Sequence, residues 1–207
     1  MRARFITLEG IDGAGKSSHL GFIGDWLAAR GVDALFTREP GGTPLGEKVR
    51  EILLAPDTEA SLDAETLLMF ASRQQLLDAV IRPALAAGRT VVSDRFTDST
   101  FAFQGGGRGV PAARIAALES WVQQGLQPDL TLLFDVPLDV AQQRMAGTRV
   151  LDRFEQQRAD FHQRVRDAYL ARAAADARIR IIDSTQPLEA VRAAVAAALE
   201  RFYTEAD

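Results

Sequence analysis

Cysteine is absent from this chain of 207 residues, and histidine occurs only twice, as His19 and His162. The lack of cysteine excludes disulfides, thiolate zinc sites and cysteine nucleophiles. Two histidines are too few for a histidine-rich metal site. Cysteine chemistry and histidine-rich metal chemistry are therefore both excluded as functions of the chain.

Long apolar runs and an excess of basic residues are also missing. No run comes near the ~18 apolar residues that a membrane span needs, and the first residues lead into a strand-like run without the apolar region of a signal peptide. The formal charge is 24 − 28 = −4, whereas a nucleic-acid-binding domain usually presents a basic face. We therefore expect a cytoplasmic enzyme that has neither nucleic acid nor membrane among its partners.

The composition that remains is that of an ordinary soluble globular protein, with 47% hydrophobic and 25% charged residues. The length suits one domain that buries its own core. No internal repeat, linker or low-complexity block divides the sequence. We expect residues 1–207 to form a single domain.

Short apolar runs alternate with helical patterns along the chain. Helical spacing covers about 16–30, 64–87 and 112–124, and it returns near the C-terminus at Leu188, Val191, Val195, Leu199 and Phe202. Strands separated by helices indicate an α/β fold, with a five-stranded parallel sheet that is covered by helices on both faces. The predicted strands are 5–8, 34–37, 90–93, 130–134 and 179–182.

Each predicted strand runs into charged residues. In order along the chain these are Glu9, Arg38-Glu39, Asp94-Arg95, Asp135 and Asp183. Ligands of an open parallel sheet bind outside the carboxyl ends of its strands. Loops are polar in any case, so one such residue says little, but five in register favour a binding site at this edge.

The segment Gly10-Ile11-Asp12-Gly13-Ala14-Gly15-Lys16-Ser17 matches the phosphate-loop pattern G-x-x-x-x-G-K-[ST]. It follows a predicted strand and opens a predicted helix, which is the context that the pattern requires. Its glycines let backbone N–H groups converge on an anion, and the helix N-terminus adds a favourable dipole. Lys16 would neutralise the β- and γ-phosphates of ATP, and the Ser17 hydroxyl would ligate Mg²⁺.

Asp94 occupies a Walker B-like place after the strand 90–93. From there its carboxylate would hold the magnesium through water. The alternative is that Asp94 caps the N-terminus of the following helix.

GTPases, transport ATPases and small-molecule kinases share the phosphate loop. The chain has neither an Asn-Lys-x-Asp element for guanine nor a Leu-Ser-Gly-Gly-Gln signature. It has instead Arg38, Arg73 and Arg95 near strand ends, and guanidinium forks match phosphate oxygens. Arg38 and Arg95 together suggest a second phosphate and so a nucleoside monophosphate as acceptor, although each alone is compatible with a surface salt bridge.

Six segments of the chain form a pattern of their own: 5–17, Thr37-Arg38-Glu39-Pro40-Gly41-Gly42-Thr43, Asp94-Arg95-Phe96 with Ser99, Phe103-Gln104-Gly105-Gly106-Gly107-Arg108-Gly109, Pro128-Asp129-Leu130-Thr131, and Asp152-Arg153-Phe154-Glu155. With them the chain resembles, over nearly its whole length, the bacterial thymidylate kinases, which transfer the γ-phosphate of ATP to dTMP. The resemblance implies the P-loop nucleoside-monophosphate-kinase fold with a small lid at about 144–158. It also implies ATP and dTMP as substrates, Mg²⁺ as cofactor, and a homodimer.

The resemblance assigns the phosphate and sugar of dTMP to four residues. Arg38 and Arg95 would hold the phosphate, and Asp12 would accept a hydrogen bond from the 3′-hydroxyl. Phe103 would press against the deoxyribose and leave no room for a 2′-hydroxyl. The family often has tyrosine at this position, so the ring is kept here while the hydroxyl is lost.

The resemblance places the thymine base on a further four residues. Phe70 would stack on the ring, although an aromatic residue at such a position is more often part of the core. Arg73 shares a helix face with Phe70 and would donate to a thymine carbonyl. Thr100 and Gln104 would line the base pocket, with Ser99 also among the dTMP-binding residues.

The lid would supply the remaining catalytic charge. Gly13 stands where one branch of the family has an arginine in the phosphate loop, so the resemblance implies a lid arginine instead. Arg153 is the first candidate and Arg149 the second, with Gly147 as a hinge. Arg144 would lie over the adenine, which the loop 184–187 would close. For each lid arginine the alternative is a solvated helix face.

Two other functions remain open at this stage. A different P-loop kinase would not need the Arg38–Pro40 segment or Phe70, and a nucleotide-gated regulator would bind ATP and dTMP without turnover. The helices at 64–87 and 112–124 carry more apolar residues than one buried stripe requires, so they are the candidates for a dimer interface.

Overall fold

The computed structural model describes residues 2–146 and 152–205. Its strands are β1 (Phe5–Glu9), β2 (Ala34–Arg38), β3 (Thr90–Asp94), β4 (Leu130–Asp135) and β5 (Ile179–Asp183). Its helices are α1 (Ser17–Ala28), α2 (Pro44–Leu54), α3 (Leu62–Leu76), α4 (Arg82–Ala86), α5 (Thr97–Thr100), α6 (Ala112–Gln123), α7 (Leu138–Met145), α8 (Ala159–Ala175) and α9 (Leu188–Glu205), with π-helical turns η1 (Leu77–Ile81) and η2 (Phe101–Gly107).

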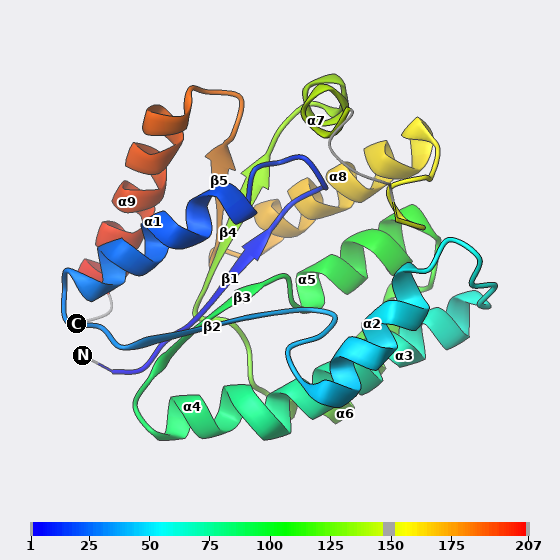
Figure 1. Ribbon diagram of the computed structural model, residues 1–207, viewed down its shortest axis with the longest axis horizontal. Coiled ribbons are helices and arrows are strands. Elements are labelled where there is room, and N and C mark those ends of the chain that lie inside the picture. The colour runs from blue at the N-terminus through cyan, green and yellow to red at the C-terminus, as the bar shows by residue number, and fades with distance from the viewer. Residues whose placement is uncertain (1, 147–151, 206–207) are drawn as a thin grey trace.

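The five strands form one parallel sheet in the order β2-β3-β1-β4-β5 (Figure 1). All five predicted strands are confirmed, and each is one residue longer than predicted. In every case the added residue is the charged residue at the strand end, from Glu9 to Asp183. The backbone ladder continues through these residues, as the pairing of Asp135 with Asp183 shows.

Helices cover both faces of this sheet (Figure 1). Side chains alternate along β1, so that Ile6 and Leu8 join the core cluster that contains α1 and α9, while Phe5 joins the cluster of α3, α4 and α6. The next residues on the Phe5 face are Thr7 and Glu9. Glu9 is therefore carried into the interior at the end of a central strand, next to the phosphate loop.

The predicted helix 64–87 is one helical run with an interruption. It begins at Leu62, because the Ser61 hydroxyl caps it by accepting from the backbone N–H of Ala64 at 3.3 Å. The π-helical turn η1 ends at Ile81, two residues before Pro83, which has no N–H to donate to the preceding turn. The predicted helices at 16–30 and 112–124 correspond to α1 and α6.

The apolar stripe of the C-terminal helix differs from the predicted one. The buried residues are Val191, Val195, Leu199 and Tyr203, which repeat every four residues. Leu188 is 47% exposed because it is the first residue of α9, before the helix meets the core. Within the described part of the chain, no helix is both long and apolar enough to cross a membrane.

Candidate functional site

The strand register brings three strand ends together. Leu8 of β1 and Arg38 of β2 both pair with Asp94 of β3, so the phosphate loop, Arg38 and Asp94 leave the sheet side by side. The other two strand ends are occupied differently: Asp135 forms an ion pair with Arg166, and Asp183 accepts from residues of its own turn. The predicted binding edge is therefore the part made by β1, β2 and β3.

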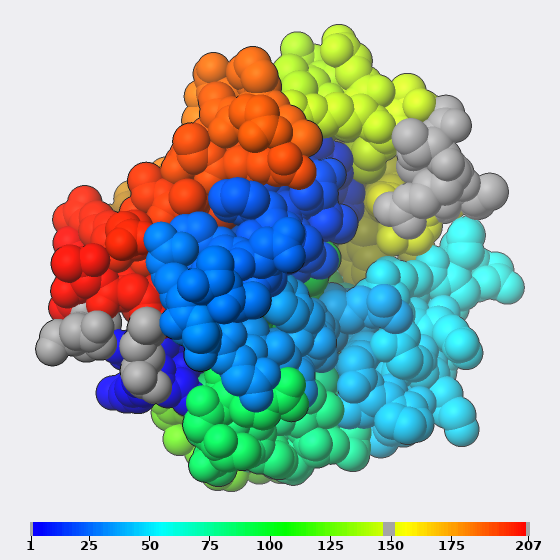
Figure 2. Space-filling view, turned by 60° about the vertical axis from the view of Figure 1, so that its left-hand side comes forward, coloured from blue at the N-terminus to red at the C-terminus, as the bar shows by residue number. Residues whose placement is uncertain are grey.

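Two neighbouring cavities open at this edge. The phosphate-loop cavity has walls from the loop and from charged side chains, namely Gly13, Gly15, Lys16, Ser17, Arg38, Asp94 and Arg144. The inner cavity lies between α2, α3, α5 and η2, and Figure 2 shows the surface hollowed between the blue N-terminal segment and the cyan segment of α2. Asp12, Glu39, Arg50 and Arg95 line both cavities, so two ligands bound there would meet at these side chains.

The phosphate loop is packed too closely to accept side chains at its glycines. Gly10 and Gly13 have φ angles of 136° and 79°, a region that other residues rarely adopt. A Cβ on Gly13 would lie 2.5 Å from the carbonyl oxygen of Ala141 in α7. An arginine at Gly13 would therefore need a strained backbone and a displaced α7.

The side chain of Lys16 folds back over the phosphate loop and binds its first residues. Its Nζ donates to the carbonyl oxygens of Gly10 at 2.9 Å and Ile11 at 3.0 Å, and the side chain is buried. Burial lowers the pKa of Lys16 to about 8, and the positive charge of Arg95 acts in the same direction. Negative phosphate oxygens would favour the charged form, so this lysine is suited to bind an anion.

Asp94 and Ser17 are suited to hold Mg²⁺. Oδ1 of Asp94 is buried without a hydrogen-bond partner, which is costly unless a cation or donor satisfies it. Asp94 does not cap α5, and it lines the same cavity as Ser17 and Lys16. Among the described residues no group of three or more His, Asp or Glu side chains gathers as a metal site. The pair therefore fits Mg²⁺ that arrives with phosphates, because Mg²⁺ often uses one or two carboxylates together with phosphate oxygens and water.

Arg95 joins the two cavities through an ion pair with Asp12. Its Nη2 donates to Asp12 Oδ1 at 2.6 Å, and its Nη1 donates to the Gly10 carbonyl at 3.1 Å. Burial alone would raise the pKa of Asp12, but the charges of Arg95 and Lys16 outweigh it and hold that pKa below its ordinary value. Arg95 has a φ of 72°, and such strain in a residue other than glycine is typical of functional sites.

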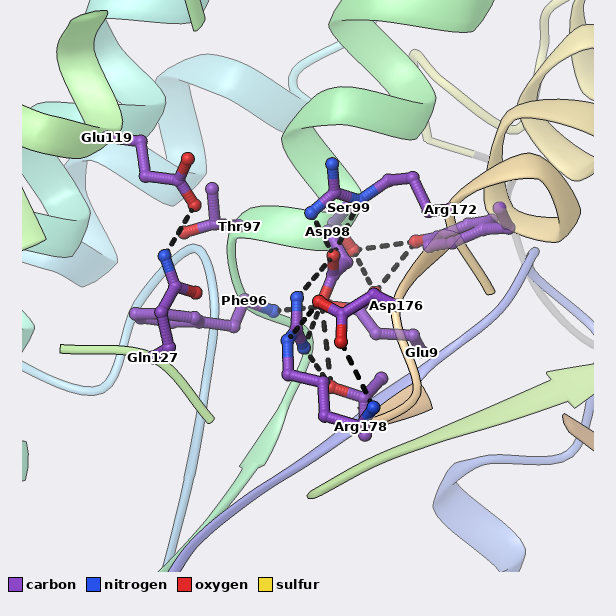
Figure 3. Close-up of polar contacts among 12 residues, drawn as sticks. Glu9, Phe96, Thr97, Asp98, Ser99, Glu119, Gln127, Arg172, Asp176 and Arg178 are labelled. Atoms are coloured by element: carbon purple, nitrogen blue, oxygen red, sulfur yellow. Dashed lines mark hydrogen bonds and ion pairs between the residues drawn. The ribbon is translucent and has the colours of Figure 1, made fainter. Parts of the chain in front are cut away.

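Glu9 lies beside Phe96 and Ser99 (Figure 3) and is linked to Arg95 through two hydroxyl groups. Its carboxylate accepts from the Phe96 backbone N–H at 2.7 Å, the Ser99 hydroxyl at 2.6 Å and the Tyr169 hydroxyl at 2.8 Å. Arg95 also donates to the Ser99 and Tyr169 hydroxyls, each at 3.2 Å. Burial, with help from the negative charge of Asp98, raises the pKa of Glu9 to about 7. The two hydroxyls thus link the buried carboxylate to the guanidinium that faces both cavities.

Asp98 anchors the same cluster to the far end of the sheet (Figure 3). It accepts from Arg172 Nε at 2.6 Å and from Arg178 Nη1 at 2.8 Å, which ties α5 to α8 and to the residue before β5. The sequence analysis did not identify Asp98, Arg172 or Arg178. These three residues lie on separate elements and share no sequence motif, so the ion pairs between Asp98 and the two arginines could not be predicted from the sequence.

Arg73 projects from α3 toward the inner cavity and has one free donor. Its Nε and Nη2 both donate to Glu39 Oε2, at 2.8 and 2.6 Å, and Nη2 also donates to the Thr100 hydroxyl at 3.1 Å. Arg73 Nη1 and Glu39 Oε1 are buried without partners. Both residues line the cavity, so a ligand that offers an acceptor and a donor could satisfy them.

The inner cavity gathers most residues that were expected to bind dTMP. Its walls include Asp12, Arg73, Arg95, Ser99, Thr100, Phe103 and Gln104. Phe103 is 7% exposed, its ring lies 4.9 Å from the Arg95 guanidinium, and it meets Phe154 edge to face. Arg38 and Phe70 are the two expected dTMP-binding residues that are not in this wall. The contacts of all these residues with dTMP stay a prediction.

Phe70 lies in α3, one turn before Arg73. It is 2% exposed and belongs to the core cluster with Phe5 and Leu76, while the Arg73 guanidinium lies 4.7 Å above its ring. The i, i+3 spacing places the Phe70 ring against the Arg73 guanidinium, and the stacking of Phe70 on thymine stays a prediction. The partly buried residue that lines the cavity at this turn is Met69, which the sequence analysis did not consider.

Two further arginines, Arg38 at the end of β2 and Arg50 in α2, line the cavities. Arg38 is half exposed, pairs with Glu47 at 3.0 Å and lines the phosphate-loop cavity. Arg50, which was not predicted, lines both cavities and donates to the Pro40 carbonyl at 2.9 Å. Arg50 lies inside α2 and far from any strand end, so the strand-end rule did not find it.

The lid residues have different positions. Arg144 donates to the Ser184 carbonyl at 2.8 Å and lies 3.5 Å from the Gly13 carbonyl, which joins the loop 184–187 to the phosphate loop. Arg153 is buried, with Nε on the Leu53 carbonyl at 2.9 Å and Nη2 on Glu65 at 2.7 Å. Arg149 and Gly147 lie outside the described residues.

Comparison with known proteins agrees with this geometry. Residues 8–195 match the family model described as thymidylate kinase. The thymidylate kinase of Chromobacterium violaceum is 69% identical over 201 residues, which cover 97% of this chain and 95% of the relative. Those of Neisseria meningitidis serogroup A and Thiobacillus denitrificans are 59% identical over 204 residues (98% and 99% covered) and 57% identical over 198 residues (95% and 96% covered). The similarity spans both cavities.

Proposed function

The chain belongs to the thymidylate kinase family, and from that premise we propose that it transfers the γ-phosphate of ATP to dTMP, giving dTDP and ADP for dTTP synthesis. ATP would occupy the phosphate-loop cavity and dTMP the inner cavity. The side chains common to both cavities, Asp12, Arg50 and Arg95 among them, lie where the two sets of phosphates would approach each other. Phosphoryl transfer depends mainly on such positioning and on charge neutralisation.

The unpaired donor of Arg73, Nη1, supports a preference for thymine as the base. Thymine has a carbonyl oxygen at C4, which can accept from Arg73 Nη1, whereas cytosine has an amino group there that would face a cation. A buried donor without an acceptor costs roughly 1–3 kcal/mol. This cost supports a site for thymine over cytosine.

Three arginines support the acceptor phosphate. Arg38, Arg50 and Arg95 line the phosphate-loop cavity next to Lys16, and two of them also line the inner cavity. Asp12, already bonded to Arg95, is placed to accept from the 3′-hydroxyl of the sugar. Phe103 closes the wall beside it and would exclude a 2′-hydroxyl.

Mg²⁺ would be held by the Ser17 hydroxyl and, directly or through water, by the free Oδ1 of Asp94. When bound it would neutralise charge on the β- and γ-phosphates. Lys16 would contact the same phosphates from the loop side. Arg144, between the phosphate loop and Ser184, would lie over the adenine.

The transition-state charge would be met from the lid, because the packing around Gly13 leaves no room for an arginine in the loop. Arg153 could take this role only by leaving both Glu65 and Leu53. That requirement favours Arg149, the second of the two lid candidates.

A homodimer formed through α3 and α6 is the proposed assembly. These helices pack against each other, with Arg114 bonded to Asp63, and each exposes a large apolar side chain: Leu67 is 53% and Trp121 73% exposed. Light scattering should give twice the chain mass for the wild type and a lower mass for Trp121→Glu. A monomeric wild type would contradict this assembly. We further propose one domain over residues 1–207, acting in the cytoplasm where ATP and dTMP are found.

A coupled assay of ADP release tests the function. With Mg²⁺ and ATP, we expect fast turnover with dTMP, weak turnover with dUMP, and little with dCMP, CMP or AMP. Equal turnover with all acceptors would indicate a different kinase. A protein that binds ATP and dTMP but releases no ADP would be a regulator instead.

A further inference from the structure

Glu65 is a fully buried carboxylate near the N-terminus of α3, outside the wall of the inner cavity. Its Oε1 accepts from Gln104 Nε2 at 2.9 Å, and its Oε2 accepts from Arg153 Nη2 at 2.7 Å. Arg108 Nε lies 3.4 Å from Oε1. The carboxylate thus joins α3, the η2 segment and Arg153 of the predicted lid.

The contact with Gln104 determines which end of that amide the inner cavity meets. An ionised carboxylate can only accept hydrogen bonds, whereas an amide offers a donor at one end and an acceptor at the other. Gln104 must therefore turn its NH₂ group toward Glu65, since its oxygen there would meet another oxygen. Gln104 lines the inner cavity, so its remaining polar atom, the carbonyl oxygen, is the one available to a ligand.

We propose that Glu65 is a specificity-determining residue that acts through Gln104: it holds the Gln104 amide oxygen toward the base and so selects an acceptor whose ring carries N3–H. This rests on the proposed function of the inner cavity. Thymine and uracil have N3–H and donate to that oxygen. Cytosine has a lone pair at N3, which would face the oxygen with no proton between them.

Arg153 stabilises the same arrangement. Its guanidinium holds the second oxygen of Glu65, and its Nε and backbone N–H donate to the carbonyls of Leu53 and Leu54 at the end of α2. The charge of Glu65 is balanced by two guanidinium groups rather than by solvent. Glu65 and Arg153 are therefore positioning residues, and Gln104 is the residue that contacts the base.

The test is the ratio of kcat/KM for dUMP to kcat/KM for dCMP, measured on full-length enzyme with saturating Mg-ATP. These two acceptors share sugar, phosphate and the lack of a methyl group, so the ratio reports the N3 and C4 edge of the base. In Glu65→Gln the side chain at 65 can donate as well as accept, so Gln104 is free to turn over. We expect the ratio to fall roughly tenfold, the effect of about one hydrogen bond, with KM for ATP unchanged. Arg73 still reads C4, so the ratio should stay above one.

Asp63→Asn is the matched control. Asp63 lies in the same first turn of α3 and also pairs with an arginine, Arg114, but on the exposed surface. This variant should keep the wild-type ratio. A folded Glu65→Gln enzyme with the wild-type ratio would overturn the proposal.

Gln104→Met keeps the proposal testable if Glu65→Gln does not fold. It removes the amide that reads N3, so the dUMP to dCMP ratio should fall to the same extent, and an unchanged ratio would overturn the proposal. Failure of the proposed function has a separate signature, which is a wild-type enzyme without preference for dTMP over dCMP. A wild type with that preference, together with unchanged ratios in the variants, contradicts only the role of Glu65.

Discussion

Arg95 and Asp12 form an ion pair of 2.6 Å between the turn after β3 and the phosphate loop. Both residues line the phosphate-loop cavity and the inner cavity. The pair therefore fixes the position of Arg95 relative to the phosphate loop. We propose that this contact within the protein aligns donor and acceptor before either ligand binds.

Asp12→Asn should lower kcat/KM for dTMP roughly ten- to hundredfold, because it weakens a charge-assisted hydrogen bond of about 1.5–3 kcal/mol. The measurement is steady-state kinetics with dTMP varied at saturating Mg-ATP. Asp135→Asn is the control, since Asp135 also ends a strand and pairs with an arginine but lines neither cavity. Equal losses in both variants would show that the Arg95 contact has no special role.

Lys16 should give the enzyme an alkaline limit. Its pKa of about 8 lies below the ordinary lysine value of 10.5 because of burial, so the charged form is lost as the pH rises through about 8. We expect kcat/KM for ATP, which reports the free enzyme, to decline above this pH. Lys16→Ala should abolish measurable turnover at any pH. A wild-type profile that stays level to pH 9.5 would contradict the assignment.

Glu9 should make stability depend on pH in a defined direction. Its folded-state pKa of about 7 lies above the ordinary value of 4.5, so between these pH values the folded state binds a proton that the unfolded state has released. The contribution of Glu9 to the free energy of unfolding therefore falls as the pH rises from about 4.5 through 7. Glu9→Gln lacks this titration. Urea unfolding at pH 5 and pH 8 should show the wild type losing more stability than Glu9→Gln, and equal changes would refute it.

Arg153→Met separates positioning from transition-state stabilisation. If Arg153 acts through Glu65, KM for dTMP should rise while kcat stays within a factor of about three, because the loss concerns substrate binding. An arginine that stabilises only the transition state would instead lower kcat and leave KM for dTMP nearly constant. That second pattern would return the catalytic role to Arg153.

The residues that could be predicted from the sequence are those that follow a strand directly or belong to a contiguous motif. The loop 10–17, Arg95 and Asp94 all follow directly from a buried strand, and the parallel sheet brings such ends together whatever the helices do. Thr100, Phe103 and Gln104 also came out on the wall of the inner cavity, through the family pattern.

Helix side chains were harder to place, because a helix offers several faces and the sequence does not say which one meets a ligand. Phe70 lies in a core cluster, whereas its neighbour Met69 lines the cavity, and the stacking of Phe70 on thymine stays a prediction. Arg50 and Glu65 were not identified for the same reason: each lies inside a helix, and its significance depends on partners more than nine residues away in the chain, such as Pro40 and Gln104.

The most direct measurement follows the label from [γ-³²P]ATP in the presence of Mg²⁺ and equal concentrations of dTMP and dCMP. Transfer to dTMP predicts that the label appears in dTDP, with far less in dCDP, and that Arg73→Met reduces this preference. Label that appears as inorganic phosphate, or is divided evenly between the two diphosphates, would contradict it.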